Sequence, residues 1–211
     1  SQILKESILQ IPKYGVIGFH PAELPFNRGR HPIIWSLVLG LESTASTFFF
    51  MNKKADEGDI ISQEKIKINI EDNAESLYEK ITQKALIQIN TFLPLLKSKK
   101  LKTISQKNLK SNTWRKRSYK DGVIDWRMSA NSIHNLIRGL TKPYLGAVFI
   151  SNGKEYTVWK SKIVNETMNN IEPGKIIKIF NNGELTVKCG DQALRIIEYE
   201  PRNEFQINEY L

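Results

Sequence analysis

The hydrophobic periodicity changes midway along the chain, and this change constrains the fold more than any other sequence feature. Before residue 97, short strand-like apolar runs alternate with helical patterns. After residue 122, one amphipathic helical pattern precedes five short strand-like runs. Strands alternating with helices are typical of an open sheet with helices on its faces, whereas five short strands favour a small barrel. The sequence therefore predicts an α/β domain followed by a small β-barrel domain.

The elements of the first half follow from local patterns. Expected strands cover residues 14–19, 46–51 and 59–70, and expected helices cover residues 32–41 and 75–96. The longer helix repeats apolar residues at spacings of three and four, which gives it one apolar face. This helix is therefore expected to dock on the sheet.

The second half is marked by two tight-turn signals. A helix is expected over residues 129–140, followed by strands over residues 146–151, 155–164, 175–180, 184–190 and 193–200. Asn152-Gly153 and Asn182-Gly183 lie between strand runs, and both residue types tolerate the positive φ that two-residue hairpin turns need. Hairpins are therefore predicted at both places. His134, on the polar side of its expected helix, is not a catalytic candidate.

A basic strip separates the two halves. Residues 97–120 hold ten Lys and Arg residues and no acid; the whole chain has charge +9, and the remainder balances at 21 − 22, or −1. The strip is either a solvated linker or a track for a phosphorylated substrate or RNA, on whose bases Trp114 and Tyr119 could stack. We expect domains over residues 1–102 and 122–211, joined by a linker over residues 103–121.

Several function classes are excluded by what the sequence lacks. Its apolar runs are far shorter than the roughly 20 residues of a membrane-spanning helix. The single cysteine, Cys189, lies on the apolar face of an expected strand, and a reducing, cytoplasmic compartment is therefore expected. No glycine-rich phosphate loop, nucleophile elbow or Cys/His metal cluster is present. No metal cofactor is expected.

Two polar runs directly follow strands and carry the candidate chemistry. GFHPAELPFNRG places His20 at the end of one strand, and NKKADEGD places Asp56 after another. Ligands of open α/β sheets bind at the carboxyl ends of strands, so both side chains are expected at one edge. A carboxylate beside an imidazole favours its protonated form, which suits acid–base chemistry. The residues alone equally allow a capping histidine and an acidic turn residue.

These runs resemble the 10-formyltetrahydrofolate-dependent formyltransferases, whose pattern is Asn-x-His, then Leu-Pro-x-x-Arg-Gly, then Asp-x-Gly-x-Ile. The interval agrees with that family, since 56 − 20 gives 36. RKRSYKDGVIDW, SANSIHNLIRGLTKPYLGAVF and CGDQALRII resemble the linker and C-terminal domain of the same family. The resemblance therefore covers nearly the whole chain.

The resemblance implies a Rossmann-like catalytic domain and an OB-like barrel. The upstream half of the family's sheet is expected outside this sequence, and a half sheet alone would expose an apolar strand edge. The implied reaction moves a formyl group from 10-formyltetrahydrofolate, the co-substrate, to a primary amine. His20 would stabilise the oxyanion and shuttle a proton, and Asp56 would keep the imidazole suitably protonated.

Folate contacts are also implied by the resemblance. The positions that match the family's folate-binding residues are Gln2, Ile3, Leu4, Arg30, Asn52, Lys53, Lys54, Ala55 and Asp56. In the first segment and in the loop over residues 52–56, backbone groups would contact the pterin edge.

One position departs from the family pattern. Gly18 stands where the family has the asparagine that donates to the reacting carbonyl oxygen. Loss of one such donor typically costs on the order of 10² to 10³ in rate. A folate-binding protein with weak or no turnover is therefore an alternative to an active enzyme.

The resemblance leaves the acceptor open. RGRHPIIW, RKRSYKDG and EYTVWKSKIV are closer to the sugar N-formyltransferases, which favours a nucleotide-linked amino sugar, a small-molecule acceptor. Methionyl-tRNA is the alternative that suits the basic strip. Formyl-folate hydrolysis and glycinamide ribonucleotide formylation give no reason for the C-terminal barrel. A homodimer stays open, and no membrane partner is expected.

Overall fold

The computed structural model describes residues 4–164 and 169–211, which fall into two compact units. The first unit holds the residues up to Ser36 together with Leu41–Ile70 and Ser76–Arg117, and the second holds Leu37–Gly40, Glu71–Glu75 and Ser118–Leu211. Among the described residues, no helix has the length and apolar character that a membrane crossing requires.

A three-stranded sheet forms the centre of the first unit. Its order is β1 (Ile17–His20), β3 (Ser43–Phe50), β4 (Ile60–Lys67), and both pairings are antiparallel. The short helices α1 (Glu6–Leu9) and α2 (Pro32–Val38) flank β1 in the sequence. The expected strands are thus present, although α2 ends three residues before its expected boundary.

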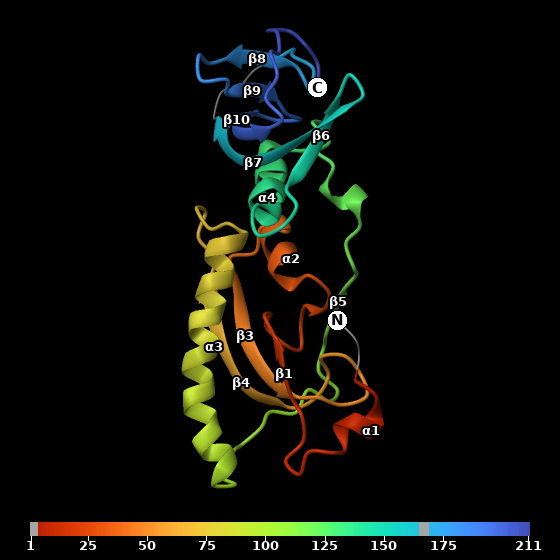
Figure 1. Ribbon diagram of the computed structural model, residues 1–211, viewed down its shortest axis with the longest axis vertical. Coiled ribbons are helices and arrows are strands. Elements are labelled where there is room, and N and C mark those ends of the chain that lie inside the picture. Colours follow the sequence, from red (N-terminus) through yellow and green to blue (C-terminus); the bar gives the residue numbers. More distant parts are fainter. Residues whose placement is uncertain (1–3, 165–168) are drawn as a thin grey trace. The chain divides into compact units, whose positions relative to one another are not determined.

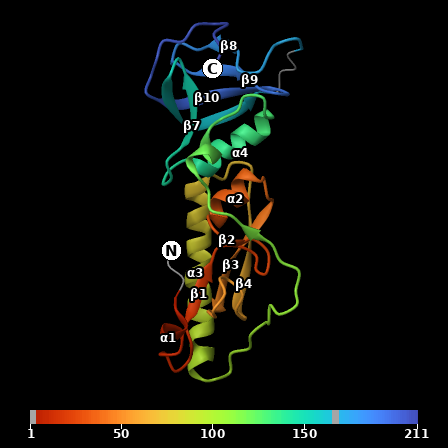
Figure 2. The same cartoon turned by 90° about the vertical axis from the view of Figure 1, so that its right-hand side faces the viewer.

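The long helix α3 (Ala74–Lys97) lies along the sheet, as Figures 1 and 2 both show. Its apolar face buries Leu77, Ile81 and Phe92, and the Phe92 ring lies 5.1 Å from that of Phe48 on β3. Gln88, 2% exposed, donates hydrogen bonds across this interface to the Ser46 carbonyl at 3.0 Å and to Ser62 Oγ at 2.9 Å. The predicted docking of this helix on the sheet is confirmed.

The strand directions correct one expectation. Because β1 and β3 are antiparallel and Ile17 pairs with Phe50, their carboxyl ends lie at opposite ends of the sheet. The expectation that both strands end at one edge was wrong, since burial patterns report which residues are buried but not the direction of a strand. The loop over residues 51–59 must return by the length of β1, about 10 Å, to bring Asp56 near His20.

The chain after α3 is held to the first unit by backbone pairing. Ile104 forms an isolated antiparallel bridge with Ile60, and β5 (Thr113–Trp114) pairs in parallel with β2 (Arg28–Gly29). Figures 1 and 2 show this segment returning beside the sheet to β5. We call residues 104–115 the linker segment. Its lysines are exposed, but its backbone is paired, so it is not simply a solvated linker.

The second unit is built around a five-stranded antiparallel sheet. The strands are β6 (Ala147–Ser151), β7 (Lys154–Val164), β8 (Ile176–Ile179), β9 (Leu185–Lys188) and β10 (Ala193–Glu200), in the spatial order β6-β7-β10-β9-β8. The short 3₁₀ helix η1 (Tyr119–Gly122) and α4 (Ala130–Leu140) precede them. The expected small β domain is therefore present.

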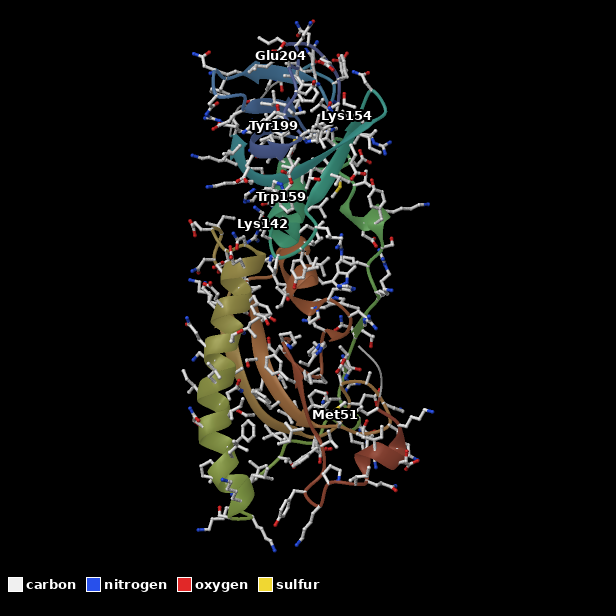
Figure 3. The ribbon with its side chains drawn as sticks, viewed as in Figure 1. Met51, Lys142, Lys154, Trp159, Tyr199 and Glu204 are labelled. Carbon is white, nitrogen blue, oxygen red and sulfur yellow. The ribbon has the colours of Figure 1, made fainter. Side chains whose placement is uncertain are left out.

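Both predicted hairpins of this unit are present. Asn152 and Gly153, with φ of 51° and 74°, connect β6 to β7, and Gly183, with φ of 79°, lies between β8 and β9. Aromatic rings fill the core: Phe149 stacks on Tyr156 with centroids 5.0 Å apart. At the surface, Lys142 lies over the Trp159 ring (Figure 3).

Candidate functional site

His20 is positioned by the alternation of β1. Gly18 and His20 are buried on one face of the strand, whereas Phe19 between them is exposed on the other. The His20 Nε2 atom lies 2.7 Å from the Asn27 carbonyl oxygen, and Nδ1 lies 3.7 Å from Asp56 Oδ2. Because a carbonyl oxygen only accepts hydrogen bonds, Nε2 carries a proton. Nδ1 is the ring nitrogen that faces the carboxylate.

Asp56 reaches His20 from the tip of the returning loop. Its backbone has φ of 57°, a left-handed conformation that non-glycine residues adopt mainly in tight turns. Its Oδ2 atom accepts a hydrogen bond from the Gly29 backbone N–H at 2.9 Å. The imidazole and the carboxylate are largely buried, with side chains 6% and 17% exposed. The structure thus brings together the two side chains that the sequence singled out.

The arrangement is suited to moving a proton. An imidazole shielded from water and next to a carboxylate can hold a positive charge in its protonated form, because the opposite charge lies within 4 Å. The backbone contacts to Asn27 and Gly29 fix both groups before any ligand arrives. Such a pair can act as an acid and a base on a group bound beside it.

The position of Gly18 is filled by its neighbours. A Cβ atom there would lie 2.7 Å from Phe49 Cζ and 2.9 Å from Met51 Cγ, closer than such atoms approach. Phe49 is the cross-strand partner of Gly18 and forms a core cluster with Leu24 and Ile60, against which Met51 packs (Figure 3). No side chain at position 18 can reach the reacting centre unless this cluster rearranges.

A cavity of about 630 Å³ adjoins the Asp56 loop. Its walls come from Arg28, from the loop at Asn52, Lys53, Lys54, Glu57 and Asp59, and from the linker segment at residues 105–109. Three cations of this cavity lie near carboxylates, since Lys53 pairs with Glu6 at 2.8 Å and Glu57 lies 3.4 Å from both Lys54 and Arg28, and Lys107 is a fourth lining cation. It is a mixed polar cavity rather than a purely basic one.

The predicted folate contacts have mixed locations. Asn52, Lys53 and Lys54 line the cavity, and Asn52 Oδ1 accepts the Lys54 N–H at 2.9 Å. Leu4, Arg30, Ala55 and Asp56 do not line it; the Arg30 backbone N–H donates to the Trp114 carbonyl at 3.1 Å. Gln2 and Ile3 lie outside the described residues.

Gln106 is a site residue that sequence reasoning missed. It is 3% exposed, and its amide hydrogen-bonds to Arg28 and to backbone carbonyls of the Asp56 loop. Nothing in the sequence distinguishes this glutamine from other polar residues of the basic strip. Arg28 belongs to the Arg-Gly pair of the motif, but its contact with the linker segment was not foreseen.

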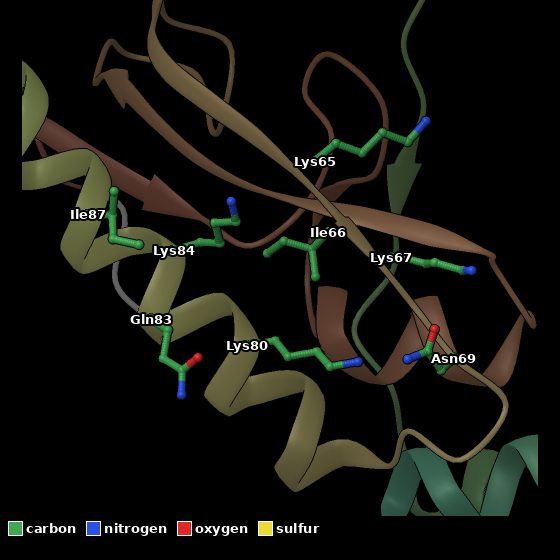
Figure 4. Close-up of a pocket in the computed structure, with 8 residues that line it drawn as sticks. All are labelled: Lys65, Ile66, Lys67, Asn69, Lys80, Gln83, Lys84 and Ile87. Atoms are coloured by element: carbon green, nitrogen blue, oxygen red, sulfur yellow. The ribbon is translucent and has the colours of Figure 1, made fainter.

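A second cavity, of about 350 Å³, lies between β4 and α3. Figure 4 shows Lys65 and Lys67 on the strand, and Lys80 and Lys84 on the helix. We call it the lysine groove. None of its described lining residues is a histidine, cysteine or acid, so it has cations but no catalytic group.

The described residues do not favour metal chemistry or a cysteine nucleophile. Residues 4–164 and 169–211 contain no group of three or more His, Cys, Asp or Glu residues that could hold a metal ion. Burial raises the pKa of the Cys189 thiol to about 12, which leaves it without the thiolate that a nucleophile needs.

Comparison with known families matches both halves of the chain. The family model described as formyl transferase matches residues 1–91, and the model of the formyl transferase C-terminal domain matches residues 116–211. Together they cover most of the chain, on either side of the linker segment.

Two curated relatives are similar in sequence. The bifunctional polymyxin resistance protein ArnA of Wigglesworthia glossinidia brevipalpis is 40% identical over 196 residues, which are 93% of this chain and 29% of that protein. A methionyl-tRNA formyltransferase of Caldanaerobacter subterraneus subsp. tengcongensis is 37% identical over 212 residues, 100% of this chain and 67% of the relative. This chain thus spans less than a third of one relative and about two thirds of the other.

A solved structure shows the same fold. The sugar 3N-formyl transferase WlaRD, crystallised in the presence of dTDP and 5-N-formyl-THF, has a TM-score of 0.74 with 20% identity. The match covers 96% of this chain and 71% of that chain. This likeness confirms the predicted fold class, a Rossmann-like part followed by a small β domain.

Proposed function

Because this chain belongs to the formyl transferase family, we propose that it transfers a formyl group from 10-formyltetrahydrofolate to a primary amine. The observation that carries the proposal is the convergence of His20 and Asp56, whose facing atoms lie 3.7 Å apart although 35 residues separate them in the sequence. The place proposed for the donor is the cavity lined by the loop that the resemblance assigns to folate; its lining includes neighbours of Asp56 in that loop but neither His20 nor Asp56 itself.

The residues have defined roles in this reaction. The amine nitrogen attacks the formyl carbon, so a new C–N bond forms and negative charge develops on the formyl oxygen. In this proposal His20 stabilises that oxygen and takes up the proton that leaves the amine, which requires its Nε2 to turn from the Asn27 carbonyl towards the reacting group, while Asp56 at Nδ1 balances the charge of the imidazolium. The bond from the formyl carbon to the folate nitrogen then breaks. The folate nitrogen takes the proton, and the products are tetrahydrofolate and the formylated amine.

The folate site extends from the Asp56 loop in this proposal. Asn52, Lys53 and Lys54 line the cavity, and in this proposal backbone groups of their loop contact the planar heterocycle of the donor. Arg30, Ala55, Leu4 and the residues before it are assigned by their match to the family pattern alone. The reaction needs no metal ion.

The acceptor we favour is the amine of a nucleotide-linked sugar. Carboxylates near Arg28, Lys53 and Lys54 offset much of the positive charge of the cavity, which suits a ligand with few charges better than a long polyanion. The sugar 3N-formyl transferase WlaRD, whose fold is shared, supports the same choice. Reactions on such nucleotides belong in the cytoplasm, which is where we place this protein.

A second candidate acceptor is methionyl-tRNA. The lysine groove favours it, because four lysines on neighbouring elements, of which Lys84 lies 3.9 Å from Glu64, can bind phosphates of a nucleic acid (Figure 4). A relative named methionyl-tRNA formyltransferase is 37% identical to this chain.

The two acceptors are separated by one assay. The protein that contains this chain is incubated with 10-formyltetrahydrofolate and, in separate reactions, with amino-sugar nucleotides and with methionyl-tRNA, and formylated products are measured. Formylation of an amino-sugar nucleotide alone supports the first acceptor. Formylation of the tRNA alone supports the second acceptor, provided that the double variant Lys80→Gln/Lys84→Gln binds the tRNA more weakly than the wild type does. Folate binding without transfer to any amine contradicts the enzyme and supports a binding protein.

A further inference from the structure

The loop that carries Asp56 has a backbone that must be held in an unusual shape. Asp56 has φ of 57°, and a Cβ on Gly58 would lie 1.6 Å from the Phe50 carbonyl oxygen, so only glycine fits there. The carboxylate contacts Gly29 and His20 only while the loop keeps this shape. A constraint on the loop backbone is therefore a constraint on the candidate site.

Gln106 of the linker segment supplies such a constraint. Its Nε2 group donates one hydrogen bond to the Asp56 carbonyl at 3.0 Å and another to the Gly58 carbonyl at 2.6 Å. Both N–H groups of the amide are thus used on backbone acceptors of a single loop. The side chain is 3% exposed, so water does not replace these bonds easily.

Arg28 fixes the orientation of this amide. Its Nη2 donates to Gln106 Oε1 at 2.8 Å, and Arg28 is itself 8% exposed. A guanidinium has donors only, so the oxygen of the amide must face Arg28 and the NH₂ group must face the loop. The same arginine lies in β2, next to Gly29, whose N–H binds the Asp56 carboxylate.

We propose that Gln106 is a positioning residue that holds the Asp56 carboxylate against His20 and Gly29. It acts from the linker segment through the loop backbone and does not touch the reacting atoms. Its kinetic consequence rests on the proposed formyl transfer, whereas its structural consequence can be measured without any substrate.

The test replaces Gln106 by methionine, which keeps the size but removes both donors and the acceptor of the Arg28 hydrogen bond. Gln88→Met is the matched control: Gln88 is 2% exposed in the same unit and also donates two hydrogen bonds, but to Ser46 and Ser62. The first readout is amide hydrogen exchange of Gly29, whose N–H reports directly on the Asp56 carboxylate. The Arg30 amide, bound to the Trp114 carbonyl, is the internal reference for the intact β2–β5 pairing. Asp56→Ala shows the exchange expected when the carboxylate is absent.

In Gln106→Met we expect exchange at Gly29 to rise on the order of tenfold, towards its value in Asp56→Ala, with Arg30 unchanged. We expect kcat to fall about 10- to 100-fold with little change in the KM of the amine, because misplacing a catalytic group by about 1 Å has this effect. Gln88→Met is expected to lower thermal stability while leaving both readouts at wild-type values.

The proposal is overturned if the Gly29 amide exchanges at the wild-type rate in Gln106→Met. It is also overturned if Gln88→Met raises the Gly29 exchange rate as much as Gln106→Met does. If the wild-type protein transfers no formyl group to any amine, the proposed function fails, but the exchange data still decide the role of Gln106. A faster Gly29 amide together with an unchanged kcat in an active protein would also contradict positioning of a catalytic carboxylate.

Discussion

Two histidines with contrasting surroundings occupy the two units. His20 has one ring nitrogen on the Asn27 carbonyl and the other facing the Asp56 carboxylate. His134, on α4, has Nδ1 3.0 Å from Ser161 Oγ. Burial, and secondarily the positive charge of Arg138, lowers the pKa of His134 below its ordinary value of 6.5.

The two imidazoles differ in the charge that lies beside each ring, and burial adds to this difference at His134. His20 faces a negative charge, so its protonated form has a counter-ion in place. The neutral form of His134 is favoured first by burial and second by the positive charge of Arg138, and the ring contacts a hydroxyl rather than a carboxylate. The first arrangement suits proton transfer, and the second suits a structural hydrogen bond.

The strongest test of this contrast removes each ring in turn. His20→Ala is expected to reduce kcat for formyl transfer by about 10² to 10⁴, since general acid–base groups contribute rate factors of that order. His134→Ala, matched in chemistry, is expected to keep kcat within about twofold, because it lies on α4 in the second unit. Steady-state kinetics of both variants check the prediction. Equal losses in both would refute the contrast.

The next effect concerns the counter-ion. Asp56→Asn keeps the shape and the acceptor for the Gly29 N–H but removes the charge beside His20. We expect kcat to fall on the order of 10²-fold, less than for loss of the imidazole. Asp125→Asn is the control, because Asp125 pairs with Arg127 at the surface of the second unit. A wild-type rate in Asp56→Asn would show that His20 works without a counter-ion.

The sequence predicted what local patterns can carry. The apolar face of α3 and the positive φ at Asn152 and Gly153 are decided by residues within a few positions of one another. Such features can be predicted from a single sequence because the residues that cause them are neighbours in the chain. The pairing of His20 with Asp56 was also foreseen, but from a shared strand edge that the antiparallel register of β1 and β3 rules out.

What remained hidden depends on contacts between distant segments. Gln106 lies in a basic strip without periodicity, and its burial comes from Arg28 and the Asp56 loop. His134 was placed on the polar side of its helix, yet it is partly buried because it meets Ser161 of β7. Neither the turn of the loop nor the course of the linker segment is encoded in a short window of residues.

A smaller effect, on stability, is expected at position 18, where the strand that carries His20 departs from the family pattern. Gly18→Asn forces a side chain against Phe49 and Met51, and overpacking of this kind costs about 1–3 kcal/mol. In a chain of this size, each kcal/mol corresponds to about 2–4 °C in Tm. Gly153→Asn is the comparison variant: nothing lies within 4 Å of a Cβ there, but φ is 74°, so it measures the cost of backbone strain without overpacking.

Thermal unfolding and kinetics together check the Gly18 prediction. Gly18→Asn alone is expected to lower Tm without raising kcat, since the added amide cannot take the place that Phe49 fills. In the Phe49→Val background, the same substitution is expected to cost less stability, because the ring that it meets is gone. If Gly18→Asn alone has the Tm of the wild type and a higher kcat, the cluster around Phe49 adapts to the added side chain without loss of stability.

The smallest effect concerns the neutral histidine. Because the pKa of His134 is lowered in the folded protein, acid favours the unfolded chain, which takes up the proton more readily. The stabilisation is therefore present above the ordinary value of 6.5 and is lost as the pH falls through the lower, folded value. Denaturant unfolding from about pH 7.5 to about pH 5 should give a flatter stability profile for His134→Gln than for the wild type. If the two profiles have the same slope, His134 does not stay neutral in the folded state, and its contrast with His20 rests on geometry alone.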